Sequence, residues 1–503
     1  MPGIILDEAS VVRSIRNLAM TPPPHPRSTT SAAPSFAHSI VANTIPDSTR
    51  FVLIGEASHG TDEFYRMRAD ITKVLIEERG FNAVAVEGDF PDCFRANLWV
   101  RNFSSSTAHD HHDTTPDDAL SSFIRFPEWM WRNHAVKNFL QWLRRHNDTV
   151  QGISGAAANK VGFYGIDVYS LHTSAAKVVE YLKQAEPELA NAVKRRYECF
   201  YRYGEGAQDY ARAVGLFDAP DCANEAIAAL KQVLENAARR AHTMDGELGW
   251  EEQFAAEMNS SVVADAEKYY RNMFYGDEIT WNLRDTHFLH SVSRLHDHLT
   301  HRLARAASTT TTTTTTTKPE AKIVVWAHNS HLGDASATDM GQLRGEINLG
   351  QLMRERYGME TVFNIGFTTD HGHVAAADSW DTPGQRKAVR PGMPGSYEAL
   401  LHRVGLPIFA LALRPLRERE QEEHAELLKA LNGPMLERAI GVIYRPQTER
   451  QSHYFYASLP RQFDLVIHVD KTKAVRPLEP AHPSWEEEHL AKEDLMETYP
   501  FGV

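Results

Sequence analysis

The stretch Phe51–Arg68, FVLIGEASHGTDEFYRMR, decides the fold. It opens with four apolar residues, a run short enough for a buried strand, and a glycine ends the run. Thr61 and Asp62 can cap a helix, in which apolar residues then recur at helical spacing. Glu56 and His59 therefore lie in the loop between a strand and a helix. In open α/β sheets, ligands bind at the carboxyl ends of the strands, where such loops are.

Further apolar runs alternate with helical patterns along the chain. We predict strands at 82–86, 161–166, 322–326, 360–367, 372–377, 409–413, 439–444 and 463–468. We predict helices at 90–100, 129–143, 343–356 and 421–431. Strands that alternate with helices indicate βαβ units and a largely parallel sheet. The sequence therefore predicts an α/β fold with a mixed, mostly parallel central sheet flanked by helices.

Composition divides the chain into six segments. Residues 170–306 have an almost continuous helical pattern, which we interpret as an insertion that forms a lid or subdomain. The other segments are an N-terminal helix with a Pro/Ser/Thr-rich stretch at 1–44, the two parts of the α/β core at 45–169 and 322–475, a low-complexity threonine loop at 307–321, and a C-terminal tail at 476–503.

A polar, histidine-rich stretch at 103–118 (FSSSTAHDHHDTTPDD) is predicted to be a solvated loop. Its histidines, His109, His111 and His112, could bind a metal adventitiously, but a solvated loop is the simpler interpretation.

Composition also limits the class of protein. The formal net charge of −13 argues against general binding to nucleic acid or to anionic membranes. No apolar run is long enough for a membrane span, and the N-terminus lacks the pattern of a secretory signal. The three cysteines, Cys93, Cys199 and Cys222, form no framework and no CxxC motif. We therefore expect a reducing compartment and a cytoplasmic protein.

Ionisable side chains follow four of the predicted strands at the point where each strand ends. They are Glu56 and His59 after the first strand, Glu87 after the second, Asp167 after the third, and His328 and His331 after the fourth. If these strands are parallel neighbours, the groups converge on one edge of the sheet. Charge at the end of a buried strand is costly unless it is paired or solvated, so several such groups suggest a cleft. The alternative interpretation is that Asp167 caps the next helix and that His331 caps a helix or packs.

Familiar motifs of other enzyme classes are absent from the sequence. There is no GxGxxG after the first strand and no Walker loop, so nucleotide binding is unsupported. There is no GxSxG elbow, which disfavours an ordinary serine hydrolase, and no HExxH. Two imidazoles and two carboxylates suit a histidine that activates water for attack on a carbonyl. The same set would also suit a divalent metal.

Several segments together resemble the erythromycin esterase family. They are GEASHGTDEFYRMRADITKVLIEERGFNAVAVEGD at 55–89, FYGIDVYSLHTSAAKVVEYL at 163–182, WNLRDTHF at 281–288, VVWAHNSHLGD at 324–334, SHYF at 452–455 and QFDLVIHVD at 462–470. They occur in the family's order and extend over about residues 45–475. The combination is specific, whereas GExxHG alone would be weaker.

The resemblance implies an α/β core with a helical insertion over an active-site cleft. It implies hydrolysis of an ester or lactone, such as the lactone of fourteen-membered macrolide antibiotics, without a serine nucleophile. His59 matches the family's essential histidine, the proposed general base. The other matching positions are Glu56 and Glu87 as assisting carboxylates, His328 and His331 as a second histidine pair, Arg68 as a motif arginine, and Asp167 and Arg284 with no role assigned.

The resulting hypothesis is that His59 accepts a proton from water while Glu56 or Glu87 holds its other ring nitrogen. Arg68, or a protonated His328, would then stabilise the oxyanion, or His328 would protonate the leaving alkoxide. We predict no cofactor and a small-molecule ester or lactone as the partner. Two alternatives stay open: the Glu/His set could bind a divalent metal that activates water, or the scaffold could bind a small molecule without catalysis.

Overall fold

The computed structural model describes residues 7–23, 34–103, 113–150, 159–204, 206–240, 246–309, 319–414 and 421–485. Its centre is a seven-stranded sheet in the order β3-β2-β4-β1-β5-β11-β8. Every neighbouring pair in it is parallel except β11 and the edge strand β8, which are antiparallel. The strands are β1 Phe51–Ile54, β2 Ala83–Asp89, β3 Gly162–Asp167, β4 Ile323–Trp326, β5 Val362–Thr368, β8 Ile408–Ala412 and β11 Leu465–Val469.

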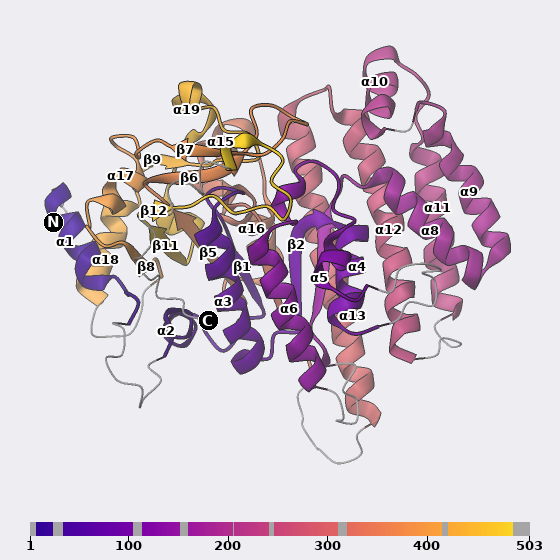
Figure 1. Cartoon of the computed structure of the whole chain (residues 1–503), viewed down its shortest axis with the longest axis horizontal. Coiled ribbons are helices and arrows are strands. Elements are labelled where there is room, and N and C mark those ends of the chain that lie inside the picture. Colours follow the sequence, from indigo (N-terminus) through magenta and orange to yellow (C-terminus); the bar gives the residue numbers. More distant parts are fainter. Residues whose placement is uncertain are drawn as a thin grey trace.

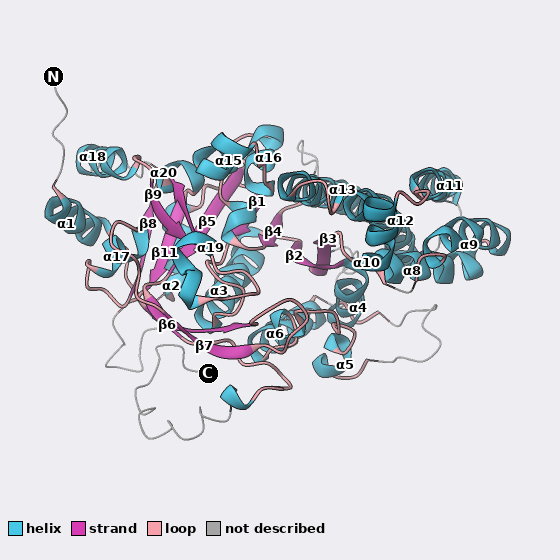
Figure 2. Ribbon diagram, turned by 90° about the horizontal axis from the view of Figure 1, so that it is seen from above, coloured by secondary structure: helices cyan, strands magenta, loops and turns pink. Residues whose placement is uncertain are grey.

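Helices cover both faces of this sheet, and two of its central strands, β1 and β4, are accordingly buried and apolar throughout. On β1, Val52 and Ile54 pack into one hydrophobic cluster, and Phe51 and Leu53 pack into another on the opposite face. Figure 2 shows the sheet between the two layers of helices. The covering helices are α2 Phe36–Thr44, α3 Asp62–Arg79 and α6 His134–Thr149 on the first face, and α13 Asp277–Thr309 and α16 Leu349–Tyr357 on the second.

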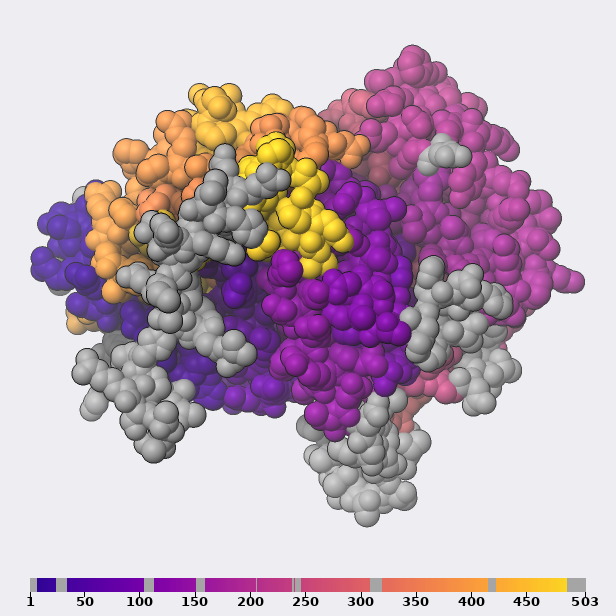
Figure 3. Space-filling view, in the orientation of Figure 1, coloured from indigo at the N-terminus to yellow at the C-terminus, as the bar shows by residue number. Residues whose placement is uncertain are grey.

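The long insertion is helical and has a hydrophobic core of its own. Figures 1 and 3 show it in magenta and pink at one end of the molecule, with the N-terminal helix at the other end. The long α13 packs against both the insertion and the central sheet, and so joins the two. The remaining helices of this part are α8 Leu171–Ala185, α9 Pro187–Tyr201, α10 Ala207–Phe217, α11 Ala223–Arg240 and α12 Gly246–Asn272.

Two small sheets and several short helices complete the described fold. A three-stranded sheet, β12-β6-β7, lies beside β5, β11 and β8 of the central sheet (Figure 1), and β9 and β10 form a separate antiparallel pair. Their strands are β6 His371–Ala376, β7 Gln385–Val389, β9 Met435–Arg438, β10 Tyr454–Ala457 and β12 Lys471–Thr472. The helices are α1 Glu8–Leu18, α4 Phe90–Val100, α5 Pro116–Leu120, α14 Asn329–Leu332, α15 Asp339–Arg344, α17 Tyr397–His402, α18 Gln421–Leu431, α19 Glu449–Ser452 and α20 Leu459–Gln462.

The predicted α/β fold with a mostly parallel sheet is confirmed, but several predicted elements are wrong. Residues 439–444 form only isolated bridges, and the strand precedes them as β9. The helix predicted at 343–356 is two helices, because Gly345 adopts a left-handed conformation with φ 70° and ends the first. The strand predicted at 372–377 is confirmed as β6, and it belongs to the small three-stranded sheet.

Other sequence predictions are corrected in part or lie outside the described residues. The aromatic segment from Trp129 begins as a 3-10 turn, and α6 starts only at His134. The segment predicted as a loop at 103–118 already forms α5 from Pro116 onward. Its three histidines and the threonine run at 310–317 lie outside the described residues.

The prediction that the cysteines form no framework is wrong, because Cys199 and Cys222 form a disulfide. It links the C-terminal part of α9 to the start of α11. Cys93 is free and buried. The disulfide removes the cysteine-based argument for a reducing compartment, so the cytoplasmic location stays a prediction. Among the described residues, no helix combines the length and apolar content that crossing a membrane requires.

Candidate active site

The loop after β1 holds a buried histidine between two carboxylates. Glu56 Oε1 lies 3.0 Å from His59 Nδ1, which leaves the other ring nitrogen of His59 directed at Glu87, 3.8 Å away. The loop passes close to β6, because a Cβ on Gly60 would lie 1.9 Å from the carbonyl oxygen of Ala375. Only glycine fits there, and this contact fixes the position of His59.

Arg68, on α3, holds this loop in place through its contact with Glu56. Its Nη2 lies 2.8 Å from Glu56 Oε2, and both side chains are fully buried. The guanidinium lies 4.5 Å from the centre of the Tyr65 ring and 5.2 Å from that of Trp326. Arg68 therefore neutralises Glu56, while Glu56 orients His59, so the chain Arg68–Glu56–His59 fixes the imidazole in one orientation.

Glu87 at the end of β2 is the centre of the second group. Its Oε2 accepts a hydrogen bond of 2.8 Å from the backbone N–H of His328. Its Oε1 accepts one of 2.8 Å from Arg284 Nη2 and lies 3.5 Å from His331 Nε2. One carboxylate thus connects the loops after β1 and β4 with helix α13.

Arg284 reaches this group from α13. Its Nε and Nη2 donate to the two oxygens of Asp167 at 3.0 and 2.8 Å, and its Nη1 lies 2.9 Å from His331 Nε2. Asp167 is thus an ion-pair partner of Arg284 and not the cap of the next helix, because the N-cap position of α8 is Ser170, whose side chain makes no capping hydrogen bond. The two-donor contact fixes the plane of the guanidinium at the cavity wall.

The hydrogen bonds assign a tautomer to each histidine of the second pair. In neutral His331, Nδ1 donates to Asp285 at 2.8 Å and Nε2 accepts from Arg284. The His331 ring stacks on Trp281 with ring centres 4.5 Å apart. His328 Nδ1 accepts the backbone N–H of Ser330, so neutral His328 carries its proton on Nε2.

The His328 Nε2–H is a buried donor that makes no hydrogen bond of ordinary geometry with the described residues. The His328 ring lies beside that of His59, with centres 4.8 Å apart. A buried donor without an acceptor costs free energy, and such sites are often places where a ligand atom binds.

Burial and charge set the protonation states in this group. Burial lowers the pKa of His59, but Glu87 and then Glu56 outweigh burial, and the pKa is raised above its ordinary value. Burial, reinforced by His59, holds the pKa of His328 well below its ordinary value, although Glu87 and the Ala57 carbonyl act against this. Burial raises the pKa of Glu87, but His331, His59 and Arg284 outweigh it, and the pKa is lowered. Glu87 is therefore an anion, and His328 is neutral.

These residues line a cavity of about 300 Å³. Its wall includes His59, Glu87, Asp167, Arg284, His328 and His331, together with aromatic side chains from Trp131, Tyr169, Trp281 and Trp380. Glu56 and Arg68 lie behind the wall and do not line it. The structure thus brings together all six predicted site residues, four at the cavity surface and two in support.

A larger cleft of about 1540 Å³ adjoins this cavity, and Asp89, Asp92, Arg125, Tyr169 and Trp380 line both. Most of the cleft lies between α4 and the insertion helices α8, α10 and α12. At the boundary, the Tyr169 ring lies between two guanidinium groups, Arg125 and Arg284, each 4.8 Å from its centre. Arg125 is held in place by Asp89, which it contacts at 2.6 and 2.9 Å.

Four polar residues of this group had no assigned role in the sequence analysis. Asp285 orients His331, Arg284 links three side chains of the site, and Arg125 with Asp89 forms the boundary with the cleft. For Arg284 and Asp285, the sequence did offer an indication, because both lie in WNLRDTHF, one of the segments that resemble the family. Nothing in the sequence around Arg125 indicated that its side chain reaches the end of β2.

Comparison with known proteins links this chain to one family. The model of a family described as erythromycin esterase matches residues 76–472. Erythromycin esterase type II of Escherichia coli is 23% identical over 337 residues, which cover 65% of this chain and 71% of that protein. The putative hydrolase YbfO of Bacillus subtilis (strain 168) is 21% identical over 374 residues, which cover 71% of this chain and 73% of that protein.

Solved structures of low sequence identity share the fold. A succinoglycan biosynthesis protein has a TM-score of 0.63 and 19% identity, with 93% of this chain and 98% of that chain covered. A Bacillus cereus protein has a TM-score of 0.66 and 16% identity, with 94% and 100% covered. A mutant of the erythromycin esterase EreC in its open conformation has a TM-score of 0.51 and 16% identity, with 86% and 93% covered. At these identities the likeness describes the fold alone.

Proposed function

Because the chain belongs to the erythromycin esterase family and is thus of a hydrolase type, we propose that it hydrolyses a carboxylic ester or lactone with water activated by His59. The observation that carries this proposal is the geometry of His59. Its Nδ1 contacts Glu56, and its Nε2 faces the cavity. The anionic carboxylate of Glu87 and the neutral imidazole donor of His328 line the same cavity.

In the proposed reaction, His59 Nε2 removes a proton from water as the water oxygen bonds to the ester carbonyl carbon. Glu56 stabilises the imidazolium that forms, and Glu87, 3.8 Å from Nε2, stabilises it further. The tetrahedral intermediate then collapses, and the imidazolium returns its proton to the departing alkoxide. No step needs a serine nucleophile.

The oxyanion contact differs from the sequence-based hypothesis. Arg68 does not line the cavity, so we assign it the role of positioning Glu56 rather than contacting substrate. His328 acts as a neutral donor, since its pKa lies well below the ordinary value and its Nε2–H lacks an acceptor of ordinary geometry among the described residues. We propose that His328 Nε2–H and Arg284 stabilise the oxyanion, a contribution of about 3–4 kcal/mol per donor.

The adjoining cleft supports a bulky substrate. A cavity of about 300 Å³ is large enough for an ester group and its nearest atoms, whereas the cleft of about 1540 Å³ exceeds the size of an ordinary drug pocket. We propose that the reacting bond lies in the small cavity and the rest of the substrate in the cleft. A macrolide-type lactone fits this division, and the family resemblance makes it the first substrate to test.

Metal-assisted hydrolysis is the second candidate mechanism, since the same carboxylates and imidazoles are ordinary metal ligands. The contacts favour the metal-free mechanism because each of the two carboxylates already has a guanidinium partner, Arg68 at Glu56 and Arg284 at Glu87. The metal-assisted mechanism predicts that chelation abolishes hydrolysis and that stoichiometric metal restores it. The metal-free mechanism predicts that chelated protein keeps its rate.

The decisive experiment replaces His59 by Asn and follows hydrolysis of macrolides, simple lactones and aryl esters by mass spectrometry. The wild-type protein should add one water to at least one of these classes. His59→Asn should lower kcat by about 10²–10⁴-fold, because the general base is lost. Unchanged hydrolysis by a folded His59→Asn protein would contradict the proposed role.

The chain offers a matched control for this experiment. His38 Nδ1 lies 3.0 Å from Glu78 Oε1, the same separation as between His59 and Glu56, but on the surface and away from both cavities. His38→Asn removes the same kind of pair and should leave kcat unchanged. A similar loss in both variants would point to a general effect on folding rather than to catalysis.

A further inference from the structure

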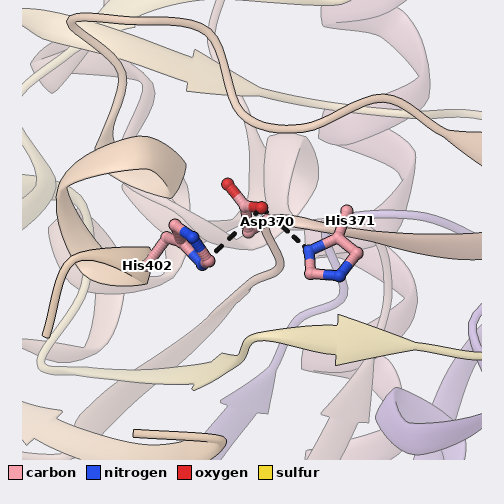
Figure 4. A group of neighbouring side chains, drawn as sticks. All are labelled: Asp370, His371 and His402. Atoms are coloured by element: carbon pink, nitrogen blue, oxygen red, sulfur yellow. Dashed lines mark hydrogen bonds and ion pairs between the residues drawn. The ribbon is translucent and has the colours of Figure 1, made fainter. Parts of the chain in front are cut away.

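A second group of imidazoles and carboxylates lies outside both cavities. Asp370 lies in the turn between β5 and β6, His371 is the first residue of β6, and His402 is the last residue of α17. Figure 4 shows both imidazoles directed at the Asp370 carboxylate from opposite sides. None of the three lines the catalytic cavity or the cleft.

The distances in this group are close to those of a metal site. Asp370 Oδ2 lies 2.9 Å from His371 Nδ1 and 3.7 Å from His402 Nδ1, and all three residues offer ligand atoms within 4.8 Å of one another. Tetrahedral bonds of about 2.0–2.2 Å to zinc place ligand atoms about 3.3–3.6 Å apart. The two separations from Asp370 Oδ2, 2.9 and 3.7 Å, lie on either side of this range.

The carboxylate is already oriented for this role. The backbone N–H of Gly392 donates to Asp370 Oδ1 at 3.0 Å, which leaves Oδ2 for the imidazoles. The Asp370 side chain is 5% exposed, whereas His371 and His402 are 35% and 49% exposed. Asp370 is thus a buried carboxylate fixed in position, and an ion can reach His371 and His402 from solvent.

A second carboxylate stands next to the group. Asp470, in the turn after β11, places Oδ1 2.6 Å from His402 Nδ1, and its carbonyl accepts the backbone N–H of His371. A nearby guanidinium, that of Arg438, bonds to the backbone carbonyls of Thr369 and Asp370 and to Glu449. Two carboxylates therefore surround one imidazole nitrogen, an arrangement that attracts a cation.

We propose that Asp370, His371 and His402 bind one divalent transition-metal ion, with Asp470 or water in the fourth position. The ligand set of two imidazole nitrogens and a carboxylate oxygen suits zinc and its neighbours, whereas calcium and magnesium prefer sites built from oxygen alone. The ion joins α17 to the turns after β5 and β11. Its binding therefore stabilises the small sheet against the central one and needs no part in hydrolysis.

The test is titration of the chelator-treated, dialysed full chain with Zn²⁺ in a calorimeter, with Co²⁺ absorbance as a second probe of coordination. We expect one tight Zn²⁺ ion per chain at this site and a rise in Tm on binding, since binding to the folded state alone stabilises it. The double variant His371→Asn and His402→Asn should weaken this binding by about 100-fold or more and abolish the Tm rise.

Controls separate this site from other histidines. A variant with His109, His111 and His112 replaced by Asn, and a second with His59→Asn, should each keep the tight site. The single variant His402→Asn, at a half-exposed position, gives the same answer if the double variant does not fold. Tight binding that survives His402→Asn, or wild-type binding only in the millimolar range, would overturn the proposal.

Discussion

At the scale of single residues, the catalytic hypothesis depends on the charge next to His59. The base must be neutral to accept a proton, so kcat/KM falls as pH drops through its pKa, which lies above the ordinary value of 6.5. After burial, Glu87 is the largest influence on this pKa, and it acts by stabilising the imidazolium. The acid side of the pH profile of kcat/KM, its lower limb, therefore depends on the charge of Glu87.

Replacing Glu87 by Gln should move this lower limb toward acid pH by about 1 unit, in addition to lowering the rate. The anion that stabilises the imidazolium is gone, while the Arg284 cation remains held by Asp167. The measurement is kcat/KM between about pH 5 and pH 9 for both proteins, a range that brackets the ordinary titration of histidine. Glu128→Gln, at an exposed residue of the cavity wall, should leave the midpoint in place. A limb that does not move in Glu87→Gln would assign the titration to another group.

The sequence predicted the members of the site better than their roles. Glu56, His59, Glu87, His328 and His331 follow apolar runs, and parallel strands bring such positions to one edge of the sheet. The role of each residue depends on its burial and on partners far along the chain, and neither can be deduced from spacing.

Arg68 illustrates this limit. It lies one helical turn after the buried Phe64 on α3, so its place on the helix was predictable. Its side chain turns away from the cavity toward Glu56, where it contacts the carboxylate instead of a substrate. The sequence alone does not show this direction, because it depends on how the loop after β1 folds back over the helix.

At the scale of elements, the start of α6 positions part of the cavity wall. The fully buried Asn133 caps this helix by accepting the backbone N–H of Val136 at 2.9 Å. Its amide nitrogen donates to the carbonyls of Trp129 and Met130 at 3.2 and 3.0 Å. One side chain thus joins the 3-10 turn at the cavity to the helix that covers the sheet.

We expect Asn133→Ala to lower the free energy of unfolding by about 2–3 kcal/mol, because the cap and two buried hydrogen bonds are lost together. Chemical denaturation followed by tryptophan fluorescence measures the change. Asn43→Ala is the matched control, since exposed Asn43 donates a hydrogen bond to the Ser39 carbonyl on the surface of α2. It should cost less than about 1 kcal/mol. Equal losses in the two variants would contradict the role given to Asn133.

Elements with strong periodic or apolar patterns were predicted well. The strand β1 and the helix α18 have the predicted bounds, and the apolar residues of each pack into the core. The strand β7 was missed because its residues are largely polar, and β10 was missed because it has only four residues and its partner is distant along the chain. The strand predicted at 439–444 has an apolar pattern, but this segment pairs only through isolated bridges to the loop after β1 and to Ala377.

At the scale of the whole molecule, the insertion is stabilised separately from the core. The Cys199–Cys222 disulfide joins two residues of the insertion that are 23 positions apart. Replacing both cysteines by Ser should lower the free energy of unfolding of the insertion by about 2–4 kcal/mol. Hydrogen exchange should show the loss in α9 to α11, with α3 and α6 unaffected. Loss of protection in the central sheet as well would show that the two parts unfold as one unit.

The position of Arg284 separates the insertion into two parts that have different structural constraints. Arg284 on α13 pairs with both Glu87 and Asp167, so a core without its insertion would leave these two carboxylates without their shared guanidinium. The helices α8, α10 and α12, which line only the outer cleft, are free of this constraint. Changes in those helices would therefore alter the wall of the cleft and leave the contacts of Arg284 in place.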